Sequence, residues 1–312
     1  MKKFNYKKID WLKVIIGLII IVYLLTKVDY SKLRGSINEI NSNDDVVKNN
    51  DITKKVEVNG NLKVYFIDVG QADSILITDN DKNMLIDAGN NSDGPKLVNY
   101  FKSLGITGFE HVIATHAHED HIGGMDDIIN NFEIKNFYMP DAISTSKTFS
   151  DMLDALEKNN MMYEVLKVDD RKELSNAYFD VLSIDSKNKE INDTSIVIKL
   201  TYGNIKFLFT GDASNNIEKK ILSKDIKADI LKLGHHGSSY SSSNDFLDKV
   251  NPKYAVIEVG LNNIYNHPTD ITLEKLSKRN IKVYRTDQNG TILFDTNGNK
   301  IDISTIKTDT NG

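Results

Sequence analysis

The chain has 312 residues, of which 40% are hydrophobic and 27% are charged, with 18 glycines and only 4 prolines. This is a globular composition, and it excludes a disordered or fibrous chain. Cysteine is absent, which excludes disulfides, cysteine-built zinc sites and a cysteine nucleophile. Residues 1–58 carry 11 basic and 7 acidic residues. The remaining residues, 59–312, carry 28 basic and 37 acidic residues, so their net charge is negative. A body this acidic is not typical of a strong nucleic-acid binder.

The first thirty residues have the pattern of a membrane anchor. Four lysines among the first eight residues precede an uncharged apolar run of thirteen residues, from Val14 to Thr26. Trp11 and Tyr23 suit the membrane interface, and the amine of Lys13 can reach the headgroups. No small-residue cleavage site follows the run, and the basic flank places the body outside the cytoplasm. We therefore expect an uncleaved, single-pass anchor, with a cleaved signal peptide or a buried soluble helix as alternatives.

Residues 31–58 are rich in Asn, Asp, Lys and Ser and have no sustained hydrophobic period. This pattern predicts a flexible tether. The domain organisation that follows is an anchor over residues 1–30, a tether over 31–58 and a folded body over 59–312.

In the body, short apolar runs alternate with amphipathic ones. Strands are predicted over Leu62–Val69, Ser74–Thr78, Met84–Asp87, His111–Thr115, Ser195–Tyr202, Ile205–Thr210, Ile230–Leu233, Tyr254–Val259, Lys282–Arg285 and Thr291–Phe294. Helices are predicted over Pro95–Leu104, Met125–Asn131, Thr148–Asn159, Ile217–Leu222, Phe246–Val250 and Thr269–Lys278. Because strand pairs come early and late with helices between them, we expect an α/β fold of four layers in the order αββα.

The first candidate functional segment has the pattern H-x-H-x-D-H, from His116 to His121. On an extended segment His116 and His118 point the same way, and Asp120 joins them. His121 points elsewhere, so one loop can serve two adjacent metal ions. Imidazole and carboxylate ligands without a thiolate suit zinc or manganese. The alternative is a polar loop whose histidines bind nothing.

Two later segments add candidates. Asp212 follows an apolar strand and a glycine, which by itself is also typical of an ordinary turn. His235 and His236 end another apolar strand and are followed by Gly237, which favours a site over a structural role. His111 begins a strand without such companions, and we expect it to be structural.

The order of these segments resembles the metallo-β-lactamase superfamily, and more closely the hydrolase domain of the ComEC/Rec2 competence proteins and their free-standing relatives. The matching stretches are Phe66–Ser74, Leu85–Gly89, His116–His121, Asn192–Ser195, Thr210–Ala213, Leu233–Ser238, Asn266–Pro268 and Tyr284–Gly290. The resemblance implies the four-layer αββα sandwich of that superfamily, here preceded by the membrane helix.

The resemblance also implies a set of metal ligands. His116 and His118 would hold the first of two divalent ions, and Asp212 would bridge both. The second ion would be held by Asp120, His121 and His235. His236 would face the substrate, although either of the paired histidines can be the ligand.

Other residues take supporting roles by the same resemblance. Catalytic roles fall on Asp120, His236 and His267, and His267 would protonate a leaving group unless it is a structural loop histidine. Asp73 and Asp87 would orient imidazoles, with ordinary turn residues as the alternative. Lys232, Arg285 and the stretch 237–239 would contact a phosphate.

One departure concerns the third histidine that completes the first metal site in most of the superfamily. No histidine lies between His121 and His235. The nearest match is Asn192–Ser195, and the ComEC-like branch resembles it in using Asn. Zinc and manganese therefore both remain candidates for the native metal.

Two ions about 3.5–4 Å apart can hold a bridging hydroxide as nucleophile and polarise the bond under attack. For the ComEC-like branch the resemblance implies phosphodiester hydrolysis, with DNA as the substrate. We therefore expect a membrane-tethered, extracytoplasmic phosphodiesterase or nuclease. The alternatives are a hydrolase of a small envelope phosphoester of the choline-phosphate type or of a lactam, and a metal-free binding protein.

Overall fold

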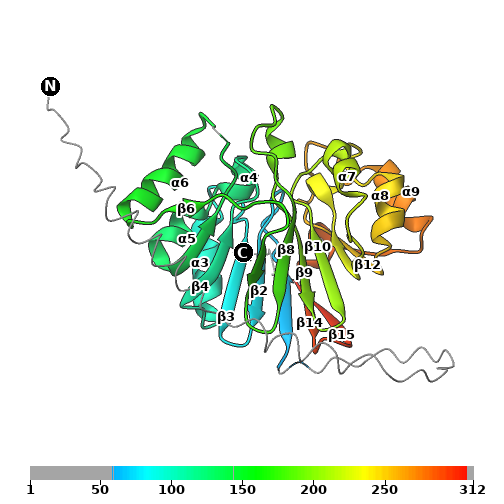
Figure 1. The fold of residues 1–312 in the computed structure, drawn as a ribbon, viewed down its shortest axis with the longest axis horizontal. Helices are drawn as coiled ribbons and strands as arrows, with labels where there is room; N and C mark the ends of the chain where they lie inside the picture. Colours follow the sequence, from blue (N-terminus) through cyan, green and yellow to red (C-terminus); the bar gives the residue numbers. More distant parts are fainter. Residues whose placement is uncertain (1–57, 59, 143, 308–312) are drawn as a thin grey trace, which may run out of the picture. The chain divides into compact units, whose positions relative to one another are not determined.

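Two mixed β-sheets packed face to face organise the chain (Figure 1). The computed structural model describes residues 58, 60–142 and 144–307, all within one compact unit. The predicted anchor and almost all of the predicted tether lie outside the described residues. In the described part no helix is long and apolar enough to cross a membrane.

The first sheet has the strand order β15-β14-β1-β2-β3-β4-β5-β6 within the described residues. Its strands are β1 (Leu62–Phe66), β2 (Ile75–Asp79), β3 (Lys82–Ile86), β4 (Gly108–Ile113), β5 (Glu133–Tyr138), β6 (Tyr163–Glu164), β14 (Thr291–Thr296) and β15 (Ile301–Ile306). The strands from β3 to β6 are parallel to one another, and the remaining pairs are antiparallel.

The second sheet has the order β13-β12-β11-β10-β9-β8-β7 in the same part of the chain. Its strands are β7 (Arg171–Glu173), β8 (Tyr178–Ser183), β9 (Val197–Tyr202), β10 (Ile205–Phe209), β11 (Ile230–Lys232), β12 (Tyr254–Ile257) and β13 (Lys282–Arg285). The strands from β10 to β13 are parallel, and β7 to β10 form antiparallel pairs.

Helices cover the outer face of each sheet. The described residues form the helices α3 (Gly94–Ser103), α4 (Glu119–Ile122), α5 (Met125–Asn131), α6 (Lys147–Lys158), α7 (Asn215–Ile221), α8 (Asn244–Val250), α9 (Asp270–Ser277) and α10 (Thr286–Asn289), with the 3₁₀ turns η1 (Ile191–Thr194) and η2 (Gly234–Gly237). Figure 1 shows α3, α5 and α6 on one flank and α7, α8 and α9 on the other. The predicted αββα order is confirmed.

Three buried clusters hold these layers together, one between the sheets and one under each helical layer. The clusters lie on both faces of each sheet because successive side chains of a strand point to opposite faces. In β1, Val64 and Phe66 join the cluster between the sheets, whereas Tyr65 joins the cluster under the helices. Strands buried on both faces read as continuous apolar runs, which is why the sequence predicts them well.

Several strands were not predicted. β5 carries the exposed Glu133 and Lys135, which interrupt its apolar pattern, and β15 is mostly exposed. β6 and β7 have only two and three residues. β8 is mostly buried, but Asp180 interrupts its apolar run. These strands pair with stronger neighbours, so the sheet defines them more than their own sequence does.

The carboxyl ends of four strands lead to the candidate functional residues. Asp87 directly follows β3, and His116 follows β4. In the second sheet, β10 leads to Asp212 and β11 leads to His235. A backbone bond joins the sheets at this edge, since Ile196 N–H donates to the Thr115 carbonyl at 3.0 Å. The fold therefore brings segments far apart in sequence to one place.

His111 lies between the two sheets and has a structural role, as predicted. Its Nε2 lies 2.9 Å from the carbonyl oxygen of Glu173 in β7, and Tyr138 Oη lies 3.2 Å from its Nδ1. Nε2 therefore donates and Nδ1 accepts. Burial lowers the pKa of His111, because the charged ring would lose its hydration.

The neutral state of His111 makes stability depend on pH. A lowered pKa in the folded chain means that its contribution is complete above pH 6.5 and is lost as the pH falls below that value. We expect the free energy of unfolding to fall more between pH 7.5 and 5.5 in the parent chain than in His111→Phe. Urea unfolding across this range measures the difference, and equal pH profiles would contradict the assignment.

Candidate metal centre

The loop after β4 carries four of the candidate ligands. It bends at residues 116 and 117, and His118 has an extended backbone directly before α4. Gly123 N–H donates to the Gly89 carbonyl at 2.8 Å, and a Cβ on Gly123 would lie 2.2 Å from the backbone of Asn90 and Asn91. Because glycine allows this close approach, the loop is held against residues 89–91.

His116, His121 and Asp212 form the first group of candidate ligand atoms. One ligand atom from each lies within 4.8 Å of the others, and all three residues are buried. His121 Nε2 is 3.4 Å from Asp212 Oδ2. His116 Nε2 lies 3.1 Å from His118 Nδ1, so these two imidazoles face the same place, as their spacing predicts.

Asp120, His121 and His236 form a second group within the same 4.8 Å limit. His236 Nε2 is 3.3 Å from Asp120 Oδ2. The two groups share His121, and its ring centroid lies 4.1 Å from that of His116 and 5.6 Å from that of His236. The chain therefore places two adjacent His/Asp sites around one central imidazole.

Asp87 determines the orientation of that central imidazole. Its Oδ2 lies 2.7 Å from His121 Nδ1 and also accepts from Thr115 Oγ1 at 2.7 Å, while Oδ1 accepts from Thr115 N–H at 2.8 Å. His121 Nδ1 therefore carries a proton, and Nε2 is left to face Asp212. This carboxylate–histidine contact is typical of metal-ligating histidines, and it agrees with the role predicted for Asp87.

The paired histidines after β11 take different environments. His236 is buried and donates from Nδ1 to the Glu258 carbonyl at 2.8 Å, which leaves Nε2 facing Asp120. His235 is half-buried, and its Nε2 lies 3.8 Å from Asp212 Oδ2. In this geometry His236, rather than His235, completes the group with Asp120 and His121. The geometry therefore favours His236 as the metal ligand, which is the alternative that the sequence analysis left open.

The carboxylates dominate the electrostatics of the centre. Burial alone would lower the pKa of His121, but Asp212, Asp87 and Asp73 raise it well above its ordinary value. Burial would likewise raise the pKa of Asp120, but His121 and His236 hold it below its ordinary value. The centre therefore contains ionised carboxylates in a buried place, which favours the binding of cations.

A buried ion pair lies behind the histidines. Lys232 Nζ contacts Asp73 Oδ2, and both side chains are buried. Asp73 Oδ1 in turn lies 3.4 Å from His236 Nδ1, which agrees with the orienting role predicted for Asp73. The prediction that Lys232 contacts a substrate phosphate is wrong, because its amine is enclosed and paired with Asp73.

Glu258 is a further buried acid that the sequence analysis missed. Its Oε1 accepts from Ser74 N–H at 3.1 Å, and burial raises its pKa well above the ordinary value. The raised pKa disfavours the charged form of Glu258, whereas Lys232 and Asp73 form a direct ion pair. An isolated Glu in an apolar strand carries no sequence signal for this role.

The other predicted phosphate contacts are also engaged within the protein. Arg285 binds Asp287 through Nε at 2.9 Å and Nη2 at 2.5 Å. Ser238 is buried, and its N–H donates to the His235 carbonyl at 2.9 Å. The guanidinium is thus neutralised locally, since a bidentate pair satisfies both partners.

The stretch in place of the third histidine lies beside the first group. Asn192 Nδ2 is 3.5 Å from His235 Nδ1, and Asn192 Oδ1 is buried without a hydrogen-bond partner among the described residues. Ser195 Oγ accepts from Asp212 N–H at 3.1 Å and lies 3.4 Å from His116 Nδ1. Ser195 and Thr115 were not predicted as site residues, because a single hydroxyl after a strand is common.

His267 lies at the side of the paired histidines. Its ring centroid is 5.5 Å from that of His235 and 6.5 Å from that of His236. Burial and these two neighbouring imidazoles lower its pKa to about 4, so the ring is neutral at pH 7. The leaving-group role expected for His267 stays a prediction.

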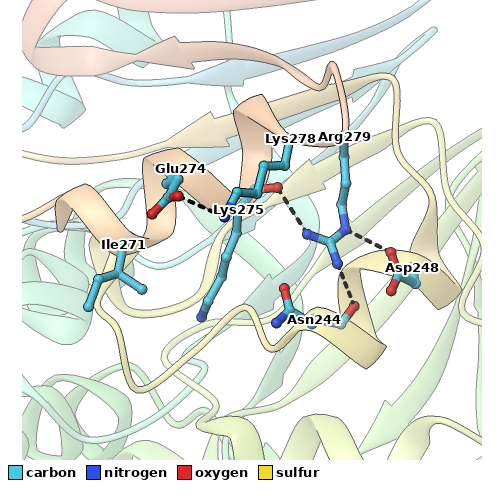
Figure 2. A pocket seen from close by; sticks show the side chains of 7 residues that line it. All are labelled: Asn244, Asp248, Ile271, Glu274, Lys275, Lys278 and Arg279. Atoms are coloured by element: carbon cyan, nitrogen blue, oxygen red, sulfur yellow. Dashed lines mark hydrogen bonds and ion pairs between the residues drawn. The ribbon is translucent and has the colours of Figure 1, made fainter.

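A surface pocket of about 590 Å³ lies elsewhere, between α8 and α9 (Figure 2). Two ion pairs form within it, while Lys275 Nζ donates to the Ser242 carbonyl at 3.1 Å. Arg279 Nε lies 2.7 Å from Asp248 Oδ1, and Lys278 Nζ lies 2.7 Å from Glu274 Oε1. None of the candidate metal ligands lines this pocket, so it is not part of the centre.

The profile of the metallo-beta-lactamase superfamily matches residues 67–260. The chain belongs to this superfamily. It is 31% identical to ComE operon protein 3 of Bacillus subtilis (strain 168), over 74% of this chain and 33% of that protein. It is 27% identical to competence protein ComA of Neisseria gonorrhoeae, over 73% of this chain and 31% of that protein. The body is thus related to the ComEC/Rec2 proteins, and the chain spans about a third of the length of these relatives.

The fold has a solved counterpart in YhfI, a metallo-beta-lactamase fold protein from Bacillus subtilis. The TM-score is 0.54 at 12% identity, and the match covers 75% of this chain and all of that one. Such a distant match supports the shared fold.

The residues of the centre fit divalent cations. His121 Nε2 and Asn192 Oδ1 are buried without hydrogen-bond partners in the described part of the chain, and a buried polar atom of this kind costs free energy unless something else satisfies it. Imidazole nitrogens and carboxylate oxygens are ligands for zinc and manganese. Members of this superfamily are generally metal-dependent hydrolases, and the centre has the ligand types for that chemistry.

The ion pair behind the centre gives a test of its architecture. In Lys232→Met, Asp73 becomes a buried carboxylate without its cation, and we expect a loss of about 3 kcal/mol in the free energy of unfolding. The double variant Lys232→Met/Asp73→Asn removes both charges, and we expect it to regain most of that loss. Urea unfolding measures all three chains. A stable Lys232→Met chain, or a double variant no better than the single one, would contradict this account.

Proposed function

We propose that the chain is a metal-dependent phosphodiesterase acting on DNA. The observation that carries this proposal is the pair of His/Asp groups that share His121, because adjacent ions at such groups suit the hydrolysis of phosphate esters. The DNA assignment is supported by the resemblance of the body to ComEC/Rec2 proteins and by a relative named a competence protein.

The proposed ligands follow the geometry. His116, His118 and Asp212 would hold one ion, and Asp120, His121 and His236 would hold the other. Asn192, whose amide lies 3.5 Å from His235 Nδ1, would add an oxygen donor. Divalent ions bound there supply Lewis acidity that polarises a phosphoryl oxygen and lowers the pKa of water.

The remaining residues act through the protein itself. Asp87 and the Glu258 carbonyl keep the Nδ1 atoms of His121 and His236 protonated, so that each Nε2 faces the reacting centre. Asp73 Oδ1 lies 3.4 Å from His236 Nδ1 and supports the same orientation. His267 is neutral at pH 7 and adjacent to His235 and His236. We propose that its ring takes a proton from the attacking water and passes that proton to the leaving oxygen. We propose zinc or manganese as the metal, since the oxygen donor Asn192 widens the choice beyond a histidine-only site.

The activity is tested with full-length chain in detergent and end-labelled single- and double-stranded DNA. We expect cleavage that requires added Zn²⁺ or Mn²⁺ and stops with EDTA. His118→Ala and Asp212→Ala lose ligands, so we expect no detectable cleavage from folded chains. Asp248→Ala, which removes a carboxylate from the pocket between α8 and α9, is the matched control and retains activity.

The outcomes separate the alternatives for substrate. Cleavage that survives in His118→Ala would contradict the assignment of the centre. Absence of DNA cleavage together with metal-dependent hydrolysis of a small phosphoester or a lactam would overturn the DNA assignment and leave a metallo-hydrolase with a different substrate.

We further propose that residues 1–30 anchor the chain in the membrane and that residues 31–58 tether the body outside the cytoplasm. The lysine cluster, the apolar run and the polar stretch that follows support this proposal. An anchored body would meet substrates at the cell surface.

Deletion of residues 1–30 tests the anchor. Because the described residues lie within one compact unit, we expect the shortened chain to be soluble without detergent and fully active. Fractionation of cells and size-exclusion chromatography measure this change. A shortened chain that still sediments with membranes, or one that aggregates at neutral pH, would contradict the proposal.

A further inference from the structure

The loop between β12 and α9 exposes three large apolar side chains next to the candidate metal centre. Leu261, Ile264 and Tyr265 are 72%, 87% and 61% exposed. The loop ends at His267, which lies against the paired histidines. Exposed apolar side chains that gather on one loop beside a catalytic site are typical of a surface that binds a ligand.

The loop is held in this conformation by one side chain. Asn263 Nδ2 donates to the carbonyls of Gly260 and His267 at 2.9 and 2.7 Å, and its Oδ1 accepts from His267 N–H at 3.0 Å. Gly260 N–H donates in turn to Gln71 Oε1 at 3.1 Å. The apolar residues thus project from a closed, hydrogen-bonded loop.

Three rings lead from the solvent to the centre. The ring of Tyr265 lies 5.8 Å from that of His267, with an angle of 25° between their planes. The ring of His267 lies 6.5 Å from that of His236, at 28°. Nearly parallel rings at these separations form a stack, and its outer member, Tyr265, is largely exposed.

We propose that Tyr265 is a base-stacking residue, which receives the nucleobase beside the phosphodiester to be cleaved. This inference rests on the proposed function, because it assigns the substrate class of the same centre. Stacking on an aromatic side chain holds any base, since every base has a π-face. The acidic body offers little attraction for the phosphate backbone, so stacking supplies affinity that charge does not.

The chemistry around the ring favours a base over a lipid surface. The neighbours of Tyr265 include the exposed amides of Asn262 and Asn266, which can bond base edges and are costly to bury among acyl chains. The described loop residues 260–268 also contain no lysine or arginine for anionic headgroups.

Binding is tested in the full-length chain, with all variants placed in an Asp120→Ala background to prevent cleavage. Anisotropy of a labelled single-stranded oligonucleotide gives Kd. We expect Tyr265→Leu to bind about 5- to 100-fold more weakly and Tyr265→Phe to bind as the parent does. Tyr163→Leu, at the edge strand β6 of the other sheet, is the matched control and leaves Kd unchanged.

Two further readouts identify stacking as the cause. In Tyr265→Leu the slope of log Kd against log salt stays that of the parent, because no charge is lost. In the active chain, an abasic residue is moved stepwise along the oligonucleotide. We expect it to raise KM at one position near the cleaved bond, and we expect that penalty to vanish in Tyr265→Leu.

The result that overturns the inference is an unchanged Kd in Tyr265→Leu, or a loss equally large in Leu261→Ser, which would indicate a general apolar patch. A Tyr265→Leu chain that loses binding to phosphatidylglycerol vesicles but keeps its Kd for DNA would overturn it in favour of a membrane contact. If the parent binds DNA through Tyr265 but does not cleave it, the base-stacking role of Tyr265 holds and the proposed function fails. If the parent cleaves DNA and Tyr265→Leu changes neither Kd nor KM, the proposed function holds and the inference about Tyr265 fails.

Discussion

The hydrogen bond between Asp87 and His121 is the interaction on which the candidate metal centre depends. His121 is the one residue shared by both ligand groups. Its Nδ1 carries a proton and contacts a carboxylate, whereas its Nε2 is available as a metal ligand. Asp87 holds Nδ1 at 2.7 Å, and Nε2 is thereby directed at Asp212. Thr115 donates twice to the same carboxylate, so the carboxylate itself cannot rotate freely. Since β3 delivers Asp87 and the loop after β4 delivers His121, the parallel pairing of these strands is a condition for the centre.

Buried cationic side chains next to the ligands balance the negative charge of the buried carboxylates. Lys232 places a buried cation against Asp73, and Asp73 faces the imidazole of His236. Asp73, Asp87, Asp120 and Asp212 would repel one another in a buried place, and the protein meets this with one lysine and several imidazoles. The arrangement explains why Lys232, at the end of an apolar strand, is unsuited to substrate binding.

The order of layers was predictable because the strands of the core are buried on both faces. Their apolar runs and the glycines between them mark β1, β3, β9 and β10 without any tertiary information. The strands that the sequence missed, such as β5 with Glu133 and Lys135, owe their conformation to pairing with β4. Local sequence does not encode such strands strongly, because a partner strand supplies their hydrogen bonds and half of their packing.

The sequence by itself determined which residues can carry the chemistry. The spacing of His116, His118, Asp120 and His121 is a local property of one loop, and ligand type and spacing need no fold to be recognised. Only the tertiary structure decided how distant residues combine, because the role of an imidazole depends on what its other nitrogen contacts. It paired His236 with the Glu258 carbonyl and left His235 half-buried. It enclosed Lys232 against Asp73, since both residues come from strands or loops that meet only when the two sheets pack.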